Sequence, residues 1–280
     1  MYLCWKEGVI TEASEAQVNT RDIGMLRGYG VYDGITVING KGSHMEGHLQ
    51  RFRTSAEGLA LSVPLSDQEI VDAVSALAER YGGKRFNVRL ILTGGQLFNG
   101  LEFDPAQSTF YILSEPHAPP APERYTQGGT LITYEHARQY AQYKTINYIA
   151  AVMAAIERKK TGADEALFVS DGNVLECSTS NFFIVKNGEV ITSATGILPG
   201  IVRKAIIRLF AAKGIQVTQR AVSVEEVMNA DEVFITGSFK DILPIVTIDQ
   251  EQIGDGKVGP VSVDIVATFA QHLAAGSPEL

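Results

Sequence analysis

Four prolines fall within the short stretch from Glu115 to Glu123, and this cluster constrains the fold more than any other feature of the chain. Proline lacks a backbone N–H and fixes φ, so neither a continuous helix nor an interior strand can run through the cluster. On each side of it the chain is long enough to bury a core of its own, since domains usually hold about 100 to 200 residues. We therefore predict two domains, residues 1–114 and 124–280, joined by a linker at 115–123.

Local patterns before the linker predict both strands and helices. The β-branched run Gly34–Asn39 ends in the turn signal Asn39-Gly40 and predicts a strand, and Phe86–Leu92 and Thr109–Leu113 predict two more. The pair Ser66-x-x-Glu69 is a capping box that opens a helix. Apolar side chains recur at helical spacing in two runs, at Leu49, Phe52, Ala56 and Leu59 and at Ile70, Val71, Val74, Leu77 and Ala78.

The same signals recur after the linker. Strands are predicted at Thr130–Tyr134 and Ala166–Val169, with a helix between them marked by Ile146, Ile149, Val152, Met153 and Ile156. A hairpin is predicted at Asn181–Val185 and Glu189–Thr192 through Asn187-Gly188. Further helices are expected at Ile201–Lys213, stopped by Gly214, and at Ile265–Leu273. Both domains are therefore α+β in fold class.

The charge balance argues against several classes of partner. Lys and Arg total 24 against 32 Asp and Glu, which gives a net charge of −8 and no basic run of the kind that binds nucleic acid or anionic membranes. No apolar stretch approaches the roughly 20 residues that span a bilayer, and the N-terminus shows no secretory signal. We expect a cytoplasmic protein that binds neither nucleic acid nor membrane. Cys4 and Cys177 match no metal or redox spacing and are expected to be reduced thiols.

Common cofactor and catalytic motifs are missing. The chain has no phosphate-binding P-loop, an incomplete dinucleotide fingerprint at Arg27-Gly28-Tyr29-Gly30, and no nucleophile elbow. His44 and His48 have the spacing of a helical metal pair, but no third ligand accompanies them, so no metal site is predicted.

Five segments in chain order carry a stronger signal: His48-Leu49-Gln50-Arg51, Lys144-Thr145-Ile146-Asn147-Tyr148, Glu176-Cys177-Ser178-Thr179-Ser180-Asn181, Leu198-Pro199-Gly200-Ile201-Val202-Arg203 and Thr236-Gly237-Ser238. Together they resemble the fold-type IV pyridoxal-phosphate (PLP) enzymes. That family includes D-amino-acid transaminases, branched-chain aminotransferases and aminodeoxychorismate lyase. The resemblance runs from about Asp22 to Pro244 and implies two α+β domains with pyridoxal 5'-phosphate between them.

The resemblance assigns roles to two residues whose chemistry suits the cofactor. PLP needs an amine that forms a Schiff base and shuttles a proton, and Lys144 matches the family's catalytic lysine. A carboxylate near the pyridine nitrogen stabilises its protonated form, and Glu176 matches that residue. In isolation, each would be interpreted as an ordinary surface charge.

The phosphate of the cofactor needs donors and a positive charge. The predicted helix N-terminus at Gly200 supplies backbone N–H groups from Ile201 and Val202, although the family often has Thr where Val202 stands. Arg51 matches the phosphate-binding arginine. The resemblance also implies cofactor contacts by Ser178, Thr179 and Ser238, and by Tyr148, for which a buried core tyrosine is the alternative.

A transaminase must also hold the α-carboxylate of its substrate, and two arginines are candidates. Arg27 lies in a Gly-rich loop that, in this family, reaches the active site of the neighbouring subunit. Arg89 interrupts an apolar strand, where a buried charge is costly unless an anion meets it; a structural ion pair is the alternative for both arginines. We predict that Arg27 and Arg89 grip the carboxylate and that Tyr32 lines the pocket.

Two departures from the family templates favour that assignment. The loop Gln96–Leu101 lacks the Arg and His of well-known D-amino-acid transaminases, and Asn87 stands where branched-chain enzymes have Tyr. The segments around Arg27, Arg89 and Lys144 resemble a D-amino-acid transaminase subgroup with a two-arginine carboxylate site.

The predicted reaction is a PLP-dependent transfer of the amino group of a D-amino acid, such as D-alanine or D-glutamate, to 2-oxoglutarate or pyruvate. An L-branched-chain aminotransferase is the alternative, followed by an aminodeoxychorismate-type lyase and a non-enzymatic PLP carrier. The family further implies a homodimer in which the loop near Arg27 completes the partner's active site.

Overall fold

The computed structural model describes residues 1–277 and divides into two compact units. The N-terminal unit comprises Met1–Ala118 together with Tyr143–Asn147, and the C-terminal unit comprises Pro119–Gln142 and the residues from Tyr148 onward. The short segment that carries Lys144 thus belongs to the N-terminal unit, although it follows the proline cluster in sequence. Chain order alone does not reveal this return.

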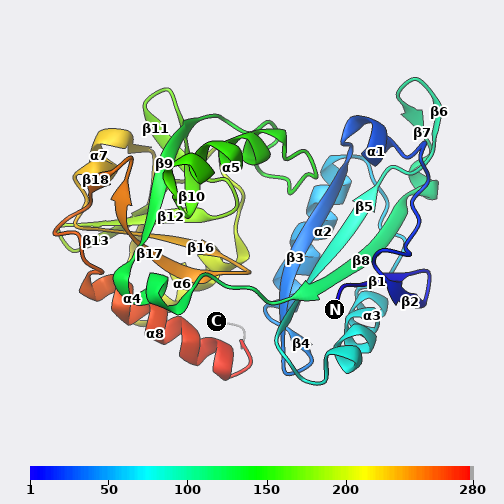
Figure 1. Ribbon diagram of the computed structural model, residues 1–280, viewed down its shortest axis with the longest axis horizontal. Helices are drawn as coiled ribbons and strands as arrows, with labels where there is room; N and C mark the ends of the chain where they lie inside the picture. Colours follow the sequence, from blue (N-terminus) through cyan, green and yellow to red (C-terminus); the bar gives the residue numbers. More distant parts are fainter. Residues whose placement is uncertain (278–280) are drawn as a thin grey trace. The chain divides into compact units, whose positions relative to one another are not determined.

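The N-terminal unit is built on a six-stranded sheet in the order β2-β1-β8-β5-β3-β4 (Figure 1). Its strands are β1 (Leu3–Lys6), β2 (Val9–Glu12), β3 (Gly30–Ile38), β4 (Lys41–Gly42), β5 (Phe86–Thr93) and β8 (Thr109–Pro116). All neighbouring strands pair antiparallel. Smaller elements complete the unit, namely α1 (Ile23–Arg27), β6 (Leu97–Asn99), β7 (Glu102–Phe103) and a 3₁₀ turn at Pro105–Gln107.

Two helices, α2 (Met45–Gly58) and α3 (Asp67–Tyr81), pack against this sheet. Phe52 of α2 and Leu77 of α3 belong to the same buried cluster as Val88 and Leu90 of β5. The predicted capping box is present, because the Ser66 hydroxyl accepts from the Glu69 N–H and the Glu69 carboxylate accepts from the Ser66 N–H. The predicted helices and strands of this half are confirmed, with ends shifted by a few residues.

The C-terminal unit holds a ten-stranded mixed sheet in the order β14-β13-β12-β16-β17-β9-β10-β11-β15, with β18 beside β17. Its central strands are β9 (Gly129–Glu135), β10 (Glu165–Ser170), β12 (Asn181–Lys186), β16 (Glu232–Gly237) and β17 (Asp241–Ile248). The outer strands are β11 (Asn173–Cys177), β13 (Glu189–Thr192), β14 (Val217–Gln219), β15 (Val222–Ser223) and β18 (Glu251–Gln252). The hairpin predicted through Asn187-Gly188 is the β12–β13 pair.

Both faces of this sheet are apolar. Phe183 and Phe234 pack in one buried cluster with helices α6 (Ile201–Ala212) and α8 (Pro260–Ala274), whereas the adjacent residues Phe182 and Ile235 pack in another. Successive side chains on a strand point to opposite faces, so an unbroken apolar run indicates a strand covered on both sides. The remaining helices are α4 (Pro122–Gln127), α5 (Ile149–Thr161) and α7 (Val224–Met228).

The helix predicted between β9 and β10 is confirmed as α5, but its apolar residues do not face a core. Ile149, Val152, Met153 and Ile156 are 75%, 57%, 48% and 49% exposed, whereas Ala154 is fully buried. The periodic pattern therefore predicted the helix correctly and leaves an apolar face on the surface of the chain. Among residues 1–277, no helix is long and apolar enough to cross a membrane.

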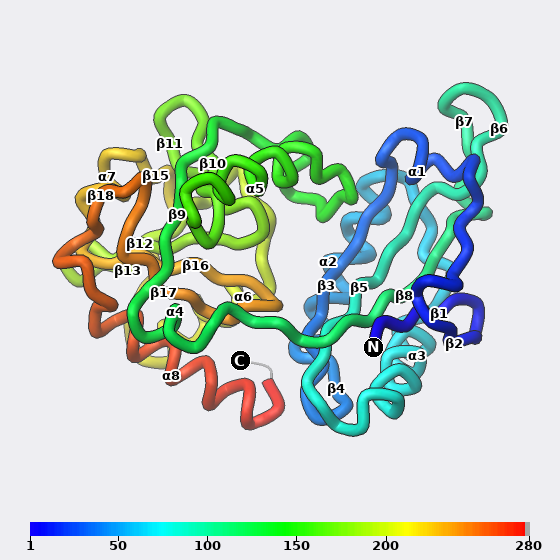
Figure 2. The backbone as a smooth tube through the Cα atoms, in the orientation of Figure 1, coloured from blue at the N-terminus to red at the C-terminus, as the bar shows by residue number. Residues whose placement is uncertain are grey.

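The proline cluster is less irregular than expected. Strand β8 runs to Pro116 and helix α4 begins at Pro122, so only residues 117–121 of the cluster lack regular structure. Figure 2 traces the backbone from β8 to α4. Proline is tolerated at both places because the end of a strand and the first turn of a helix do not require its missing N–H.

Candidate active site

Lys144 is fixed against strand β3 through its backbone. Its carbonyl accepts from the Tyr32 N–H at 2.9 Å, and its own N–H donates to the Ser55 hydroxyl at 3.1 Å. Thr145 forms an isolated bridge with Val31 in the same stretch. The Lys144 ammonium lies 4.6 Å from the centroid of the Tyr32 ring, within range of a cation–π interaction. The amine is therefore held against an aromatic face by a backbone that is hydrogen-bonded on both sides.

Arg51 forms part of a buried charge cluster with Asp33 and His48. Its Nε and Nη2 donate to the two Asp33 carboxylate oxygens at 2.8 and 2.7 Å, and His48 Nδ1 lies 2.7 Å from the same carboxylate. Burial would raise the pKa of Asp33, but Arg51 and His48 hold it well below its usual range. Burial lowers the pKa of His48, and Asp33 opposes that effect. The predicted phosphate-binding arginine is thus oriented by a carboxylate of its own unit.

The two predicted carboxylate-binding arginines lie on different elements of the N-terminal unit. Arg27 is exposed in the last turn of α1, where its guanidinium donates to the Leu26 carbonyl at 2.9 Å. Arg89 on β5 is 36% exposed and donates to Glu115 of β8 at 2.7 Å. The anion that meets Arg89 in the folded chain is therefore Glu115, so the ion pair considered as the alternative is present.

Gly28 and Gly30, in the loop after Arg27, suit their positions for different structural reasons. Gly28 ends α1 in the left-handed conformation, with φ of 66°, which suits a residue without a side chain. A Cβ on Gly30 would lie 2.6 Å from the Leu92 carbonyl oxygen of the neighbouring strand. The segment therefore folds tightly enough to bring Tyr32 beside Lys144.

In the C-terminal unit, Glu176 is buried and ion-paired. Its Oε1 accepts from Arg138 Nε at 2.7 Å, and its Oε2 accepts from the Leu198 N–H at 2.9 Å. Arg138 also donates to the Ala141 carbonyl at 2.6 Å. Glu176 is therefore no surface residue, and Arg138 compensates its charge in the folded chain.

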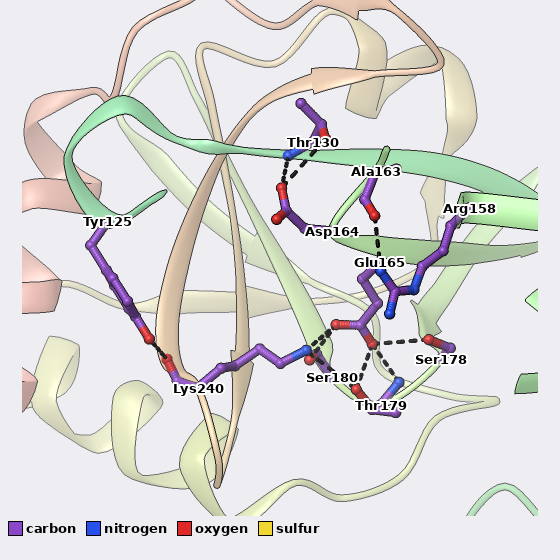
Figure 3. Close-up of polar contacts among 10 residues, drawn as sticks. All are labelled: Tyr125, Thr130, Arg158, Ala163, Asp164, Glu165, Ser178, Thr179, Ser180 and Lys240. Atoms are coloured by element: carbon purple, nitrogen blue, oxygen red, sulfur yellow. Dashed lines mark hydrogen bonds and ion pairs between the residues drawn. The ribbon is translucent and has the colours of Figure 1, made fainter. Parts of the chain in front are cut away.

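The turn that follows Glu176 is organised around a second buried carboxylate. The hydroxyls of Ser178, Thr179 and Ser180 donate to Glu165 on β10, which is also paired with Lys240 (Figure 3). Gly237 abuts this turn, since a Cβ there would lie 3.3 Å from Ser180 Oγ. Ser238 follows at once, so its segment and the predicted cofactor residues Ser178 and Thr179 lie close together.

Helix α6 begins close to Asn181 and leaves its first N–H groups without intrahelical partners. A Cβ on Gly200, the N-cap, would lie 2.0 Å from Asn181 Oδ1, so a side chain at this position would require the Asn181 side chain to move. Asn181 pairs with Thr236 across β12 and β16. Thr236 is 2% exposed, and its hydroxyl has no hydrogen-bond partner among the described residues. Ile201 and Val202 are buried at the same helix start.

Comparison with known proteins identifies the family. The Amino-transferase class IV family profile matches residues 30–248, which is most of the chain. The chain belongs to this class IV aminotransferase family. The family prediction and the α+β fold class are therefore confirmed.

Individual relatives cover almost the full chain. A putative branched-chain-amino-acid aminotransferase of Methanocaldococcus jannaschii is 31% identical over 94% of this chain and 93% of its own length. A D-alanine aminotransferase of Listeria monocytogenes is 31% identical over 97% of this chain and 96% of its own. A solved T.th. branched-chain amino acid aminotransferase with pyridoxamine 5'-phosphate has a TM-score of 0.90 at 26% identity, covering 99% of this chain and 95% of that one.

The predicted site residues of this class IV aminotransferase form two groups. Lys144, Tyr32, Arg51, Arg27 and Arg89 belong to the N-terminal unit. The others belong to the C-terminal unit, namely Tyr148, Glu176, Ser178, Thr179, Ile201, Val202 and Ser238. Tyr148 there is the N-cap residue of α5.

Sequence reasoning missed four charged residues that organise these groups: Asp33, Arg138, Glu165 and Lys240. A usable signal existed for Asp33, since an acid in the middle of an apolar strand requires a buried cation. No spacing pattern marks Arg138 or Lys240, because their partners lie 38 and 75 residues away in the chain.

Proposed function

We propose that this class IV aminotransferase moves the amino group of a D-amino acid, such as D-alanine or D-glutamate, to a 2-oxo acid such as 2-oxoglutarate or pyruvate. The observation that carries the transferase chemistry is Lys144, an amine on a fixed backbone beside the Tyr32 ring. The D-alanine aminotransferase among the relatives supports the choice of donor, together with the arginines Arg27 and Arg89.

The predicted cofactor, pyridoxal 5'-phosphate, is confirmed by the family and by a relative that holds its amino form. The donor set of this chain fits the group. The start of α6 offers backbone N–H groups. Thr236, which pairs with Asn181 across β12 and β16, carries a buried hydroxyl that has no hydrogen-bond partner among residues 1–277. When bound, the cofactor supplies an electron sink for negative charge on the substrate α-carbon.

The protein residues would then have distinct roles. Lys144 would take the proton from the substrate α-carbon and return it, and Tyr32 would line the pocket beside it. Glu176 would face the ring nitrogen with its charge compensated by Arg138. Arg51, Ile201, Val202 and Ser238 would hold the phosphate, with Ser178, Thr179 and Tyr148 as further cofactor contacts.

Arg27 and Arg89 would bind the substrate carboxylate. Since Glu115 already balances Arg89 in the folded chain, a substrate carboxylate would have to share or displace that partner. Cofactor placement between the two domains remains a prediction of the family resemblance.

The alternative donor is an L-branched-chain amino acid. The Methanocaldococcus jannaschii relative, which has the same identity as the Listeria one, favours it. In that case the arginines would accept the second carboxylate of glutamate. A lyase would release its product without any 2-oxo acid acceptor, so dependence on an acceptor separates it from both transaminases.

We further propose a homodimer. The exposed apolar side chains of α5 at Ile149, Val152, Met153 and Ile156 support self-association, because exposed patches of this kind commonly mark interfaces. In such a dimer the exposed loop at Arg27 would complete the partner's site.

The test is an absorbance spectrum of the purified protein loaded with PLP, followed by D-alanine, D-glutamate, L-leucine and L-glutamate in separate cuvettes. We expect a borohydride-reducible visible band that D-amino acids bleach faster than L-leucine does. Faster bleaching by L-leucine would establish the branched-chain alternative. Lys144→Ala should lose the visible band, and a variant that keeps it would refute the role of Lys144.

A further inference from the structure

Glu165 is a buried carboxylate that the reaction described above does not use. It lies at the start of β10 with 3% of its surface exposed, and its two oxygens are surrounded by donors (Figure 3). A buried charge is tolerated only when hydrogen bonds and an opposite charge compensate it. Burial would raise the pKa of Glu165, but Lys240 and the Thr179 donors hold it below its usual value. Glu165 is therefore an anion in the folded chain at neutral pH.

Most of the donors come from one short turn. Oε1 accepts from Ser178 Oγ at 3.1 Å, from the Thr179 N–H at 2.5 Å and from Thr179 Oγ1 at 2.8 Å. Oε2 accepts from Ser180 Oγ at 2.9 Å. A hydroxyl has a single hydrogen to donate, so these three hydroxyls cannot donate to a phosphate while they serve Glu165. The polar atoms of the turn hold its shape.

Lys240 joins this turn to a second one. Its Nζ pairs with Glu165 and donates to Thr179 Oγ1 at 3.2 Å. Its backbone is also anchored, because its carbonyl accepts from the Tyr125 hydroxyl at 2.9 Å and its N–H donates to the Gly237 carbonyl at 3.2 Å. Lys240 thus closes the turn between β16 and β17 that contains Ser238.

We propose that Glu165 and Lys240 are positioning residues whose ion pair locks the turn Ser178–Ser180 against the turn Gly237–Lys240. The lock sets the orientation of Ser238 and of the segment between Glu176 and Asn181, and through them the affinity for the phosphorylated cofactor. The proposal rests on the proposed function only for its last step, since the lock itself is a property of the polypeptide.

The test compares Lys240→Met with Glu226→Gln, which breaks the Arg220–Glu226 pair elsewhere in the same unit. Two quantities are measured, the dissociation constant for PLP and the hydrogen exchange of peptides covering 178–181 and 237–241 in the cofactor-free protein. We expect Lys240→Met to raise the dissociation constant by at least about tenfold and to speed exchange in both peptides. Lys240→Arg should recover part of the loss, because it restores the charge, and Glu226→Gln should change neither quantity.

Unchanged exchange and unchanged affinity in Lys240→Met would overturn the proposal, as would an equal loss in Glu226→Gln. Should Lys240→Met not fold, Lys240→Gln keeps a donor without the charge and is judged by the same criteria. If the unaltered protein takes up no PLP at all, the proposed function fails, and hydrogen exchange alone still decides whether the pair locks the two turns.

Discussion

Asp33 in the N-terminal unit and Glu165 in the C-terminal unit are both buried carboxylates, and their charges are compensated in different ways. Asp33 in the N-terminal unit is fully buried and faces the planar guanidinium of Arg51 through two hydrogen bonds. Glu165 in the C-terminal unit faces one flexible lysine and a turn that supplies an N–H and three hydroxyls. A guanidinium fork matches a carboxylate in charge and shape, whereas neutral donors solvate it much as water would.

The difference shows what each carboxylate organises. Removing the carboxylate of Asp33 takes away the ionic partner of the buried Arg51 cation, which lowers the free energy of unfolding. Removing the cation of Lys240 leaves the Glu165 carboxylate with its neutral donors, so the main effect is a less ordered turn at Ser178–Ser180. The first cluster therefore orients a single side chain, Arg51, and the second shapes a stretch of backbone.

The largest effect is expected from Asp33→Asn. The variant keeps the shape of the side chain but leaves Arg51, 7% exposed, without its counter-ion, so the free energy of unfolding should fall by about 3–5 kcal/mol. Urea denaturation measures the change. The matched control is Asp67→Asn, which breaks the exposed Arg53–Asp67 pair and should cost about 0–1 kcal/mol. Equal losses in the two variants would contradict the contrast.

Lys240→Met should cost less than Asp33→Asn. Glu165 keeps four neutral hydrogen bonds in this variant, so we expect a loss of about 1–3 kcal/mol in the same denaturation experiment. A loss larger than that of Asp33→Asn would show that the neutral donors contribute little and that the two clusters behave alike.

The dependence of stability on pH gives a third comparison. The folded-state pKa values of Asp33 and Glu165 are both lowered, so each acid stabilises the fold above its unfolded pKa, and this contribution is lost as the pH falls through the folded value. Denaturation between about pH 6 and pH 3 should show a falling free energy of unfolding, with a shallower slope in Glu165→Gln. A variant slope equal to that of the unaltered protein would contradict the ionised state of Glu165.

The smallest effect is expected from Glu115→Gln. Arg89 and Glu115 are 36% and 30% exposed, so solvent screens their pair and the variant should lie within about 1 kcal/mol of the unaltered protein. Under the proposed function, removing the competing carboxylate should lower the KM for D-alanine with little change in kcat. An unchanged KM would argue against Arg89 as the residue that binds the substrate carboxylate.

Elements defined by neighbouring residues could be predicted from the sequence alone. The capping box at Ser66 and Glu69 starts α3, and Asn187-Gly188 closes the β12–β13 hairpin, because the interactions involved span only a few residues. Helix α5 was also predictable from its period. Its exposed face was not, since a periodic pattern shows that a helix has an apolar side but not what covers that side.

The α+β class, the family and the motif around Lys144 could be predicted without coordinates, since they depend on local patterns and on the order of five segments along the chain. The return of Lys144 to the N-terminal unit and the pairing of Arg138 with Glu176 became visible only in the folded chain. The same holds for the pairing of Glu165 with Lys240, which lies 75 residues further along the chain. Strand pairing and loop closure bring such distant residues together, and no local periodicity encodes them. Once buried, each charge is tolerated only because the opposite charge compensates it.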